Sequence, residues 1–190
     1  MIRSFIAIEV KDPDTLAQVN SFTSRLKKNQ PRMKLVEPEN IHMTVKFLGD
    51  IHESMAPKIY NILKEEVNEK VFAGKDFEYR VKGAGQFRNY SILWIKLRGD
   101  IQFLQDIKDT VENELKEKLK IPKDKRGKFK PHITIGRLRK NRINYKTFDI
   151  FKKLIQENKN TEFGSCRISK IQLKKSVLTP TGPIYSDLVF

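Results

Sequence analysis

Hydrophobic and polar positions along this chain follow two different periods. Where the two kinds of residue alternate with a period of two, the pattern predicts a strand with one buried face. Such segments cover residues 4–10, 33–37, 41–48, 77–87, 92–97, 132–138, 167–178 and 184–189. Between them, apolar residues recur at spacings of three and four, which predicts amphipathic helices. The first helical segment begins near residue 12, and three more cover residues 59–71, 104–119 and 148–158.

The order of these elements indicates an α+β fold rather than a doubly wound parallel sheet. Helices interrupt pairs of strands instead of following each strand in turn, so antiparallel pairing is favoured. No long Pro-, Gly- or Ser-rich linker divides the chain, and we therefore expect one domain, residues 1–190. A weak repetition of strand, helix and strand in the two parts of the chain suggests two related lobes.

Charge is the compositional feature that changes this picture. The chain has 38 Lys and Arg against 23 Asp and Glu, which gives a net charge of +15. Such an excess favours a polyanionic partner such as nucleic acid, although a lysine-rich solubilising surface gives the same total. The distribution favours nucleic acid, because ten basic residues and one acid, Asp124, lie between residues 120 and 142.

Several classes of protein are not indicated by the sequence. No apolar stretch reaches the roughly 18 residues that a membrane span needs, and the first residues enter strand-like sequence without a signal peptide. The single cysteine, Cys166, cannot form an internal disulfide or anchor a zinc site alone, and a small buried residue is its simplest interpretation. We expect a soluble, cytoplasmic, monomeric protein without a membrane partner.

Two of the three histidines occur in the same short motif. His42 and Thr44 lie in ENIHMTVKF (39–47), and His132 and Thr134 lie in KFKPHITIG (128–136). Because strand side chains alternate between faces, each histidine shares a face with its threonine, opposite apolar neighbours. One such pair is typical of the polar face of a half-exposed sheet. A second copy favours a shared function, whereas the third histidine, His52, lacks a threonine partner and is expected on the surface.

The residue types of these motifs suit chemistry at a phosphate. Imidazole has an unperturbed pKa of about 6.5, so one copy can act as a neutral base while the other acts as a protonated acid. Threonine hydroxyls can donate to phosphate oxygens, and Lys or Arg side chains offset the developing negative charge. Opening a strained 2′,3′-cyclic phosphate needs only these groups, so we expect no cofactor and no metal. A metal site is the alternative, but no Asp, Glu or Cys lies within two residues of either motif histidine.

The paired tetrads HMTV and HITI resemble those of the two-histidine (2H) phosphoesterases, especially the bacterial and archaeal RNA 2′,3′-cyclic 3′-phosphodiesterases, also called 2′-5′ RNA ligases. The resemblance covers nearly the whole chain, in SFIAIEV, ENIHMTVKFLGDI, GAGQF, FKPHITIGRL and KKSVLTPTGPIYSDL. It implies a bilobal fold, with a small antiparallel sheet and outer helices in each lobe and a central cleft that carries both motifs. It also implies hydrolysis of an RNA 2′,3′-cyclic phosphate to a 2′-phosphate.

The same resemblance implies roles for the motif residues. His42 would protonate the leaving 3′ oxygen, and His132 would activate water. Thr44 and Thr134 would hold the phosphate.

Three further side chains are expected to bind the substrate. The resemblance implies that Arg137 and Phe47 enclose the terminal base, where stacking contributes about 1–3 kcal/mol. Strict alternation instead places Phe47 on the core face with Val45, so stacking requires a local twist or bulge. Lys130, in the basic run beside the second motif, is the third. The sequence departs from the family pattern Gly-x-Gly-x-Phe-Pro-x-Pro at residues 88–90, which leaves the role of that loop open.

The sequence leaves three functions to compare. The first is metal-independent hydrolysis of RNA 2′,3′-cyclic phosphate ends. The second uses the same site to ligate 2′-5′ linked tRNA halves, with a ribose hydroxyl in place of water. The third is a non-catalytic RNA-binding module, whose salt-sensitive binding would not depend on the two histidines.

Overall fold

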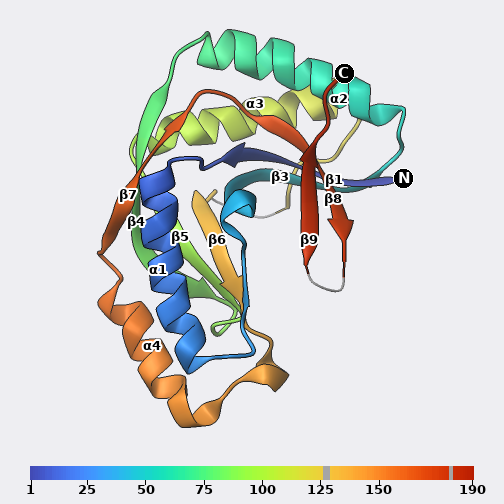
Figure 1. Cartoon of the computed structure of the whole chain (residues 1–190). Helices are drawn as coiled ribbons and strands as arrows, with labels where there is room; N and C mark the ends of the chain where they lie inside the picture. The colour runs from blue at the N-terminus through green and yellow to red at the C-terminus, as the bar shows by residue number, and fades with distance from the viewer. Residues whose placement is uncertain (126–128, 180–181) are drawn as a thin grey trace.

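An antiparallel sheet runs through the molecule (Figure 1). Its strands run in the order β7-β4-β5-β6-β3-β1-β8-β9, and the short β2 pairs with β6. The strands are β1 (Ile2–Glu9), β2 (Lys34–Leu35), β3 (His42–Ile51), β4 (Phe77–Phe87), β5 (Ile92–Arg98), β6 (His132–Arg137), β7 (Glu162–Ile168), β8 (Gln172–Leu178) and β9 (Pro183–Asp187). This computed structural model describes residues 1–125, 129–179 and 182–190. Two members of the basic run, Arg126 and Lys128, lie outside the described residues.

The helices divide between the two halves of the sheet. The half that contains β4, β5, β6 and β7 is covered by α1 (Pro13–Asn29) and α4 (Phe148–Glu157). The half that contains β1, β3, β8 and β9 is covered by α2 (Met55–Ile62), its π-helical continuation η2 (Leu63–Phe72), and α3 (Ile101–Leu119), as the upper part of Figure 1 shows. Short 3₁₀ helices occupy Pro38–Asn40, Lys140–Arg142 and Tyr145–Thr147. Within the described ranges, none of the helices has the length and apolar character needed to span a membrane.

Local signals explain where the first helix begins. The carboxylate of Asp12 accepts a hydrogen bond from the backbone N–H of Thr15 at 2.7 Å, and Pro13 occupies the first turn. Both features follow the sequence prediction, because an Asp cap satisfies an amide that the helix leaves unpaired and proline needs no such partner. The buried stripe of α1 then includes Val19, Phe22 and Leu26.

The α+β class with antiparallel pairing is confirmed, and the two expected lobes are the two halves of this sheet. They join where β3 meets β6, and the recorded register between these strands is the single pair Met43–Ile133. Elsewhere, adjacent long strands pair over several residues. The two halves therefore meet at the strands that carry the histidine motifs.

Two predicted strands differ from the observed ones. Residues 167–178 were expected to form one strand, but they form the end of β7 and all of β8, separated by residues 169–171. β7 pairs with β4 and β8 pairs with β1, so the chain must cross here from one half of the sheet to the other. The side chain of Asn68 holds this crossing by accepting from the N–H of Ile171 at 2.9 Å and donating to its carbonyl at 3.1 Å. The strand expected at 33–37 shortens to β2, because the 3₁₀ helix Pro38–Asn40 follows it.

Candidate active site

The two histidine motifs lie on neighbouring strands. His42 begins β3 and His132 begins β6, and the next residues, Met43 and Ile133, pair directly and are buried. Because strand side chains alternate, each histidine and its threonine point to the face opposite these apolar residues. The four polar side chains of this histidine face are half-buried: His42, Thr44, His132 and Thr134. The fold thus brings both motifs to one face of the sheet.

A backbone carbonyl and two aromatic rings hold the imidazole of His42. Its Nδ1 lies 2.6 Å from the carbonyl oxygen of Asn40. Since a carbonyl only accepts, Nδ1 carries the hydrogen and Nε2 is left for proton exchange. The ring centroids of Phe5 and Tyr185 lie 4.9 Å and 5.4 Å from that of His42. Burial lowers the pKa of His42, and the Lys174 ammonium lowers it further, although the hydrogen bond to the carbonyl opposes both effects.

The imidazole of His132 is held in the same manner. Its Nδ1 lies 2.6 Å from the carbonyl oxygen of Lys130, which fixes the same tautomer. The ring centroid of Phe87 lies 5.1 Å away with the planes nearly perpendicular, and that of Trp94 lies 6.3 Å away. Both histidines are therefore fixed in the same tautomer, and each donates from Nδ1 to the carbonyl of the residue two positions earlier.

A β-bulge follows the first motif and decides the position of Phe47. Two successive residues of β1 pair with Thr44 and Lys46, so Val45 is an extra residue on β3. Val45 and Lys46 are both buried, and the alternation restarts with Phe47 turned outward and 55% exposed. The ring of Phe47 lies 6.4 Å from that of Phe5, which also contacts the first histidine. Strict alternation would have placed Phe47 in the core, and the bulge is the reason that it lies on the histidine face.

A second bulge follows the second motif at the same offset. Two successive residues of β5 pair with Thr134 and Gly136, so Ile135 is the extra residue on β6. Ile135 and Gly136 are buried, and Arg137 is exposed. The guanidinium of Arg137 is close enough to His42 to contribute to the lowering of its pKa. Arg137 therefore stands on β6 as Phe47 stands on β3, five residues after the motif histidine.

Each bulged residue has a hydrogen-bond donor for its carbonyl. A bulge disrupts the ladder locally, and a buried carbonyl without a donor is costly. The carbonyl of Val45 accepts from Lys108 Nζ at 3.1 Å, and the carbonyl of Ile135 accepts from the backbone N–H of Val36 at 3.1 Å. The first bulge thus depends on a buried lysine side chain, and the second depends on backbone.

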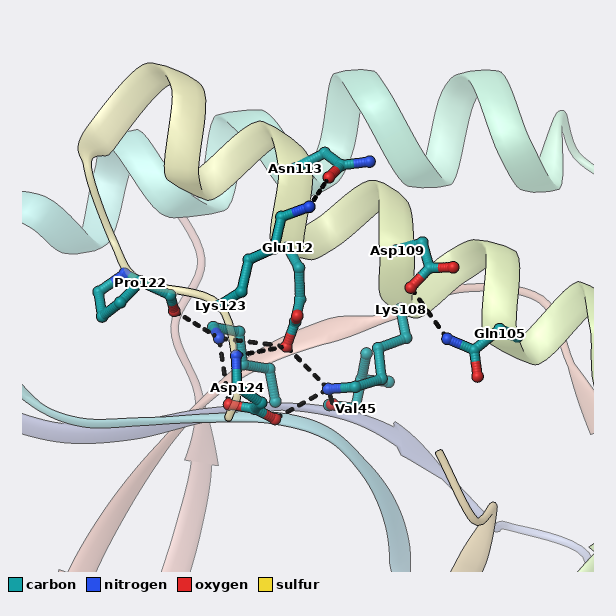
Figure 2. A network of polar contacts seen from close by, with 10 residues as sticks. Val45, Gln105, Lys108, Asp109, Glu112, Asn113, Pro122, Lys123 and Asp124 are labelled. Atoms are coloured by element: carbon teal, nitrogen blue, oxygen red, sulfur yellow. Dashed lines mark hydrogen bonds and ion pairs between the residues drawn. The ribbon is translucent and has the colours of Figure 1, made fainter. Parts of the chain in front are cut away.

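Figure 2 shows the charge network that holds Lys108 in place. Its Nζ lies 2.9 Å from Glu112 Oε1 and 2.8 Å from Asp124 Oδ2. Lys46 joins the same two carboxylates at 3.3 Å and 3.2 Å and donates to the carbonyl of Pro122 at 2.9 Å. Burial raises the pKa of Asp124, but the two ammonium groups together lower it below its usual value. This network fastens the segment after α3 to β3, directly behind the first bulge.

Comparison with known proteins identifies the family. The family model described as "AKAP7 2'5' RNA ligase-like domain" matches residues 4–185. The chain belongs to this family. Its membership confirms the resemblance to the 2H phosphoesterases that the two tetrads indicated.

Relatives and solved structures agree with this assignment over nearly the whole chain. The RNA 2′,3′-cyclic phosphodiesterase of Methanothermobacter thermautotrophicus is 32% identical, covering 98% of this chain and 96% of its own length. That of Archaeoglobus fulgidus is 33% identical and covers 98% of both. The structure of TT0787 of Thermus thermophilus has a TM-score of 0.70 at 24% identity, over 99% of this chain and 96% of its own. E. coli LigT complexed with 3'-AMP has a TM-score of 0.67 at 18% identity, over 99% and 95%. The solved structures confirm the fold.

The sequence analysis missed a charged cluster beside the first histidine of this 2′-5′ RNA ligase-like chain. Lys174 Nζ contacts Glu9 and lies 2.5 Å from Asp187, and Lys11 lies 2.5 Å from Glu9. Burial raises the pKa of Glu9, but its hydrogen bonds with the two lysines lower it to about 2. A cavity of about 280 Å³ is lined by His42 together with Glu9, Lys174 and Asp187. No periodic pattern signals such a cluster, because its four members come from three strands and the loop after β1.

The loop that departs from the family pattern is anchored by its neighbours. Arg88, Asn89 and Tyr90 all have positive φ, at 51°, 51° and 66°. Such a conformation costs a non-glycine residue roughly 1–2 kcal/mol. The N–H of Tyr90 donates to Gln86 Oε1 at 2.8 Å, and its ring packs 5.6 Å from that of Phe148. These contacts hold the turn between β4 and β5 without the prolines of the family pattern.

The remaining candidate residues have different positions. The side chain of Lys130 is exposed, and its carbonyl is the group that contacts the second histidine. His52 is exposed and lies 2.8 Å from Ser54 Oγ. Cys166 is buried, and burial raises its pKa to about 12, so its thiol is not activated. Across the described part of the chain, no three His, Cys, Asp or Glu side chains are grouped to hold a metal ion.

Proposed function

We propose that this protein hydrolyses RNA ends that carry a 2′,3′-cyclic phosphate and leaves a 2′-phosphate. The observation that carries the proposal is the pair of His-Thr motifs on one face, each with its Nδ1 donating to a carbonyl. Two imidazoles fixed in this tautomer can exchange protons through Nε2 on either side of one phosphate. Relatives named RNA 2′,3′-cyclic phosphodiesterase, at 32% and 33% identity over nearly the full length, support this activity.

The proposed displacement assigns one proton transfer to each histidine. His132 Nε2 accepts a proton from water as the water oxygen attacks phosphorus. The bond between phosphorus and the 3′ oxygen breaks, and His42 Nε2 donates a proton to that oxygen. The hydroxyls of Thr44 and Thr134 donate to the non-bridging oxygens as their charge increases. Both transfers use side chains, so the proposed reaction requires no metal ion.

The acid role of His42 depends on the substrate. Burial lowers the pKa of this histidine in the unliganded protein, which favours its neutral form. A bound cyclic phosphate places a negative charge beside the ring, and an opposite charge at short range raises the pKa. Binding would therefore protonate His42 when the acid is needed. The mirrored assignment, with His42 as the base, predicts a different pH dependence.

The proposed base site lies between the two residues at the fifth position after the histidines. Phe47 offers an exposed aromatic face, and Arg137 offers a planar cation. Stacking of a base on an aromatic ring contributes about 1–3 kcal/mol, and a guanidinium can stack on the other face. Lys130 is proposed to bind a phosphate oxygen from the edge of the site.

The direct test uses a short RNA with a 2′,3′-cyclic phosphate end, in EDTA. We expect the wild type to form a 2′-monophosphate. His42→Ala and His132→Ala should each lower turnover by about 10²–10⁴-fold, since general acid and base catalysis contribute that much. Circular dichroism should show an unchanged fold in both variants. Turnover that EDTA abolishes, or histidine variants that remain fully active, would contradict the proposal.

Ligation of 2′-5′ linked RNA is a second candidate, favoured by the family description "2'5' RNA ligase-like". The same geometry would act with a 5′-hydroxyl of a tRNA half in place of water. Incubating matched tRNA halves with the protein, and measuring joined product against hydrolysed ends, compares the two reactions. RNA binding that both histidine variants retain, without turnover in the wild type, would instead indicate a non-catalytic module.

A monomeric state, a cytoplasmic location and action on tRNA fragments stay predictions. Sedimentation equilibrium tests the first, because a monomer of 22.3 kDa is expected. Cell fractionation tests the second. Sequencing of cyclic-phosphate RNA ends that accumulate when the protein is depleted tests the third.

A further inference from the structure

The histidine face continues beyond the motifs onto the next strand. His132 pairs directly with Lys96 of β5, and Thr134 pairs directly with Trp94. Directly paired residues of an antiparallel sheet point to the same face. Arg98 follows Lys96 by two positions and shares this face. The catalytic strand β6 is thus bordered by a row of one aromatic and two basic side chains.

A cavity of about 240 Å³ opens along this row. Its walls include Trp94, Lys96 and Arg98 from β5, Gly85 and Gln86 from β4, and Lys159 from the turn after α4. We call these six residues the upstream groove. They border the second histidine through Trp94, whose ring lies 6.3 Å from that of His132.

The backbone of β4 is shaped to accept the indole ring. A Cβ atom on Gly85 would lie 2.2 Å from Cη2 of Trp94, so only glycine lets the ring lie against the strand. Lys96 Nζ lies 5.5 Å from the ring centroid, which is cation–π distance. Among the described residues the buried Nε1 of Trp94 has no hydrogen-bond partner. A buried donor without an acceptor is rare in folded proteins, so this one calls for an explanation.

Within the part of the chain that the structure describes, the three cations of the groove are not neutralised by neighbouring acids, whereas several lysines elsewhere on the surface are. Lys70, Lys118 and Lys152 form ion pairs with acids on their own or adjacent helices. Lys96, Arg98 and Lys159 form no ion pair with any acid in the described portions of the chain. Lys96 and Arg98 are two positions apart on a strand, or about 6.7 Å. The groove therefore presents a row of uncompensated positive charge that leads away from the histidines.

We propose that the upstream groove binds the nucleotides on the 5′ side of the cyclic phosphate. The phosphates of this single-stranded segment contact Lys96, Arg98 and Lys159, and one base stacks on Trp94. This combination of a basic track with an aromatic ring is how proteins hold single strands without reading their sequence. The inference rests on the proposed function, and it extends the substrate from a terminal nucleotide to an RNA strand.

The test compares two substrates that share the same reacting end. One is cytidine 2′,3′-cyclic phosphate, and the other is an RNA trinucleotide that ends in the same group. Arg98→Ala/Lys159→Ala removes two exposed cations that do not touch the terminal nucleotide. Lys64→Ala/Lys116→Ala is the matched control, because it removes the same charge from exposed positions on η2 and α3.

We expect the groove variant to lose about ten-fold or more in kcat/KM for the trinucleotide and to keep its kcat/KM for the mononucleotide. The dependence of trinucleotide binding on salt should also weaken, by about 1.4 in the slope of log K against log salt, since each phosphate contact contributes about 0.7. The control variant should match the wild type on both substrates. Equal losses on both substrates, or no loss on either, would contradict the proposal that the upstream groove binds RNA.

Failure of the proposed function is distinguishable from failure of the groove. If the wild type hydrolyses neither substrate, the activity is wrong. Fluorescence anisotropy of a labelled trinucleotide with a 2′-phosphate end then tests RNA binding by the upstream groove separately. Weaker binding by Arg98→Ala/Lys159→Ala than by the control variant supports it, and equal binding rejects it.

Discussion

Phe47 and Arg137 occupy equivalent places in the two halves of the protein, each five residues after a motif histidine and each beyond a bulge. An odd offset would send them to the core side of a regular strand. One extra residue in each strand, Val45 or Ile135, turns both back to the histidine face. The two bulges thus bring Phe47 and Arg137 to the face that carries both His-Thr pairs.

The first prediction concerns the lysine that holds the bulge behind Phe47. Lys108→Met removes the donor of the Val45 carbonyl, so we expect Phe47 to lose its fixed position. Phe47→Ala should lower kcat/KM for a mononucleoside cyclic phosphate by about ten-fold, mainly through KM, since stacking contributes about 1–3 kcal/mol. Lys108→Met should cause a similar loss. In the double variant the losses should not add, because both changes remove one interaction.

Lys116→Met on the exposed side of α3 is the control for this cycle. Activity should be measured well below the melting temperature of each variant, so that lost stability does not reduce the folded fraction. Additive losses would show that Lys108 does not act through Phe47.

The second prediction identifies the role of His42 from the pH profile. The pKa of this histidine is lowered, so an acid role places the alkaline limb of kcat/KM below about pH 6.5. Lys174→Met removes a cation that lowers this pKa, while Glu9 keeps its ion pair with Lys11, so the pKa of His42 should rise. As the acid, His42 would shift the alkaline limb to higher pH. If the acid limb shifts instead, His42 is the base.

Lys170→Met provides the comparison for this profile. Lys170 is exposed in the crossing between β7 and β8 and forms no ion pair within the described ranges. Its removal should leave both limbs unchanged. The profile should be recorded at low and high salt, because screening weakens long-range charge effects more than a contact beside the ring.

The third prediction concerns the glycine beneath the indole. Gly85→Ala places a methyl group where the Trp94 ring lies, so the ring must move and its packing near His132 must change. We expect kcat/KM to fall by about ten-fold, because a ring that packs beside the second histidine would be displaced and small displacements near reacting groups lower the rate. The chain has one tryptophan, so its intrinsic fluorescence reports the movement directly.

Gly74→Ala is a demanding control for that experiment. Gly74 has a φ of +72°, but a Cβ atom there meets nothing within 4 Å. Its substitution strains the backbone without touching the site, so stability should fall by about 1 kcal/mol while fluorescence and activity stay the same. An unchanged emission spectrum in Gly85→Ala would contradict the predicted movement.

The fourth prediction concerns the stability of the network in Figure 2. Two lysines and two carboxylates balance there, and Lys46 is 2% exposed. Lys46→Met leaves one carboxylate uncompensated, so the free energy of unfolding should fall by about 3 kcal/mol, measured by urea denaturation. Replacing Glu112 with Leu as well should recover part of this loss, because charge balance returns. Lys152→Met, which breaks an exposed pair with Asp149, should change stability little.

Sequence reasoning predicted the fold class and the strands that carry the motifs because periodicity reports which face of an element is buried. It also predicted the cap at Asp12, since capping is a local interaction. The crossing at residues 169–171 was missed, because the alternation continues through it and only the partners of β7 and β8 differ. Pairing partners are a property of the whole sheet and leave little trace in a single strand.

For the site, the sequence supplied the four motif residues and the need for a bulge at Phe47. It could not supply the bulge itself, because nothing in HMTVKF distinguishes an extra residue from a regular one. The polar residue Lys46 at a core position was the available signal, and its buried partners come from α3 and the segment after it. The sequence also gave no sign that Tyr185 and Lys174 lie beside His42, since they come from the other end of the chain.

The route of the chain through the two halves has a mechanical consequence. β1 belongs to one half, α1 and β2 to the other, β3 and α2 to the first again, and the last strands return once more after β7. No single cut in the gene would release either half intact. The strands that carry the two motif histidines are therefore tethered at many points along the polypeptide, which opposes a wide hinge motion between the two halves.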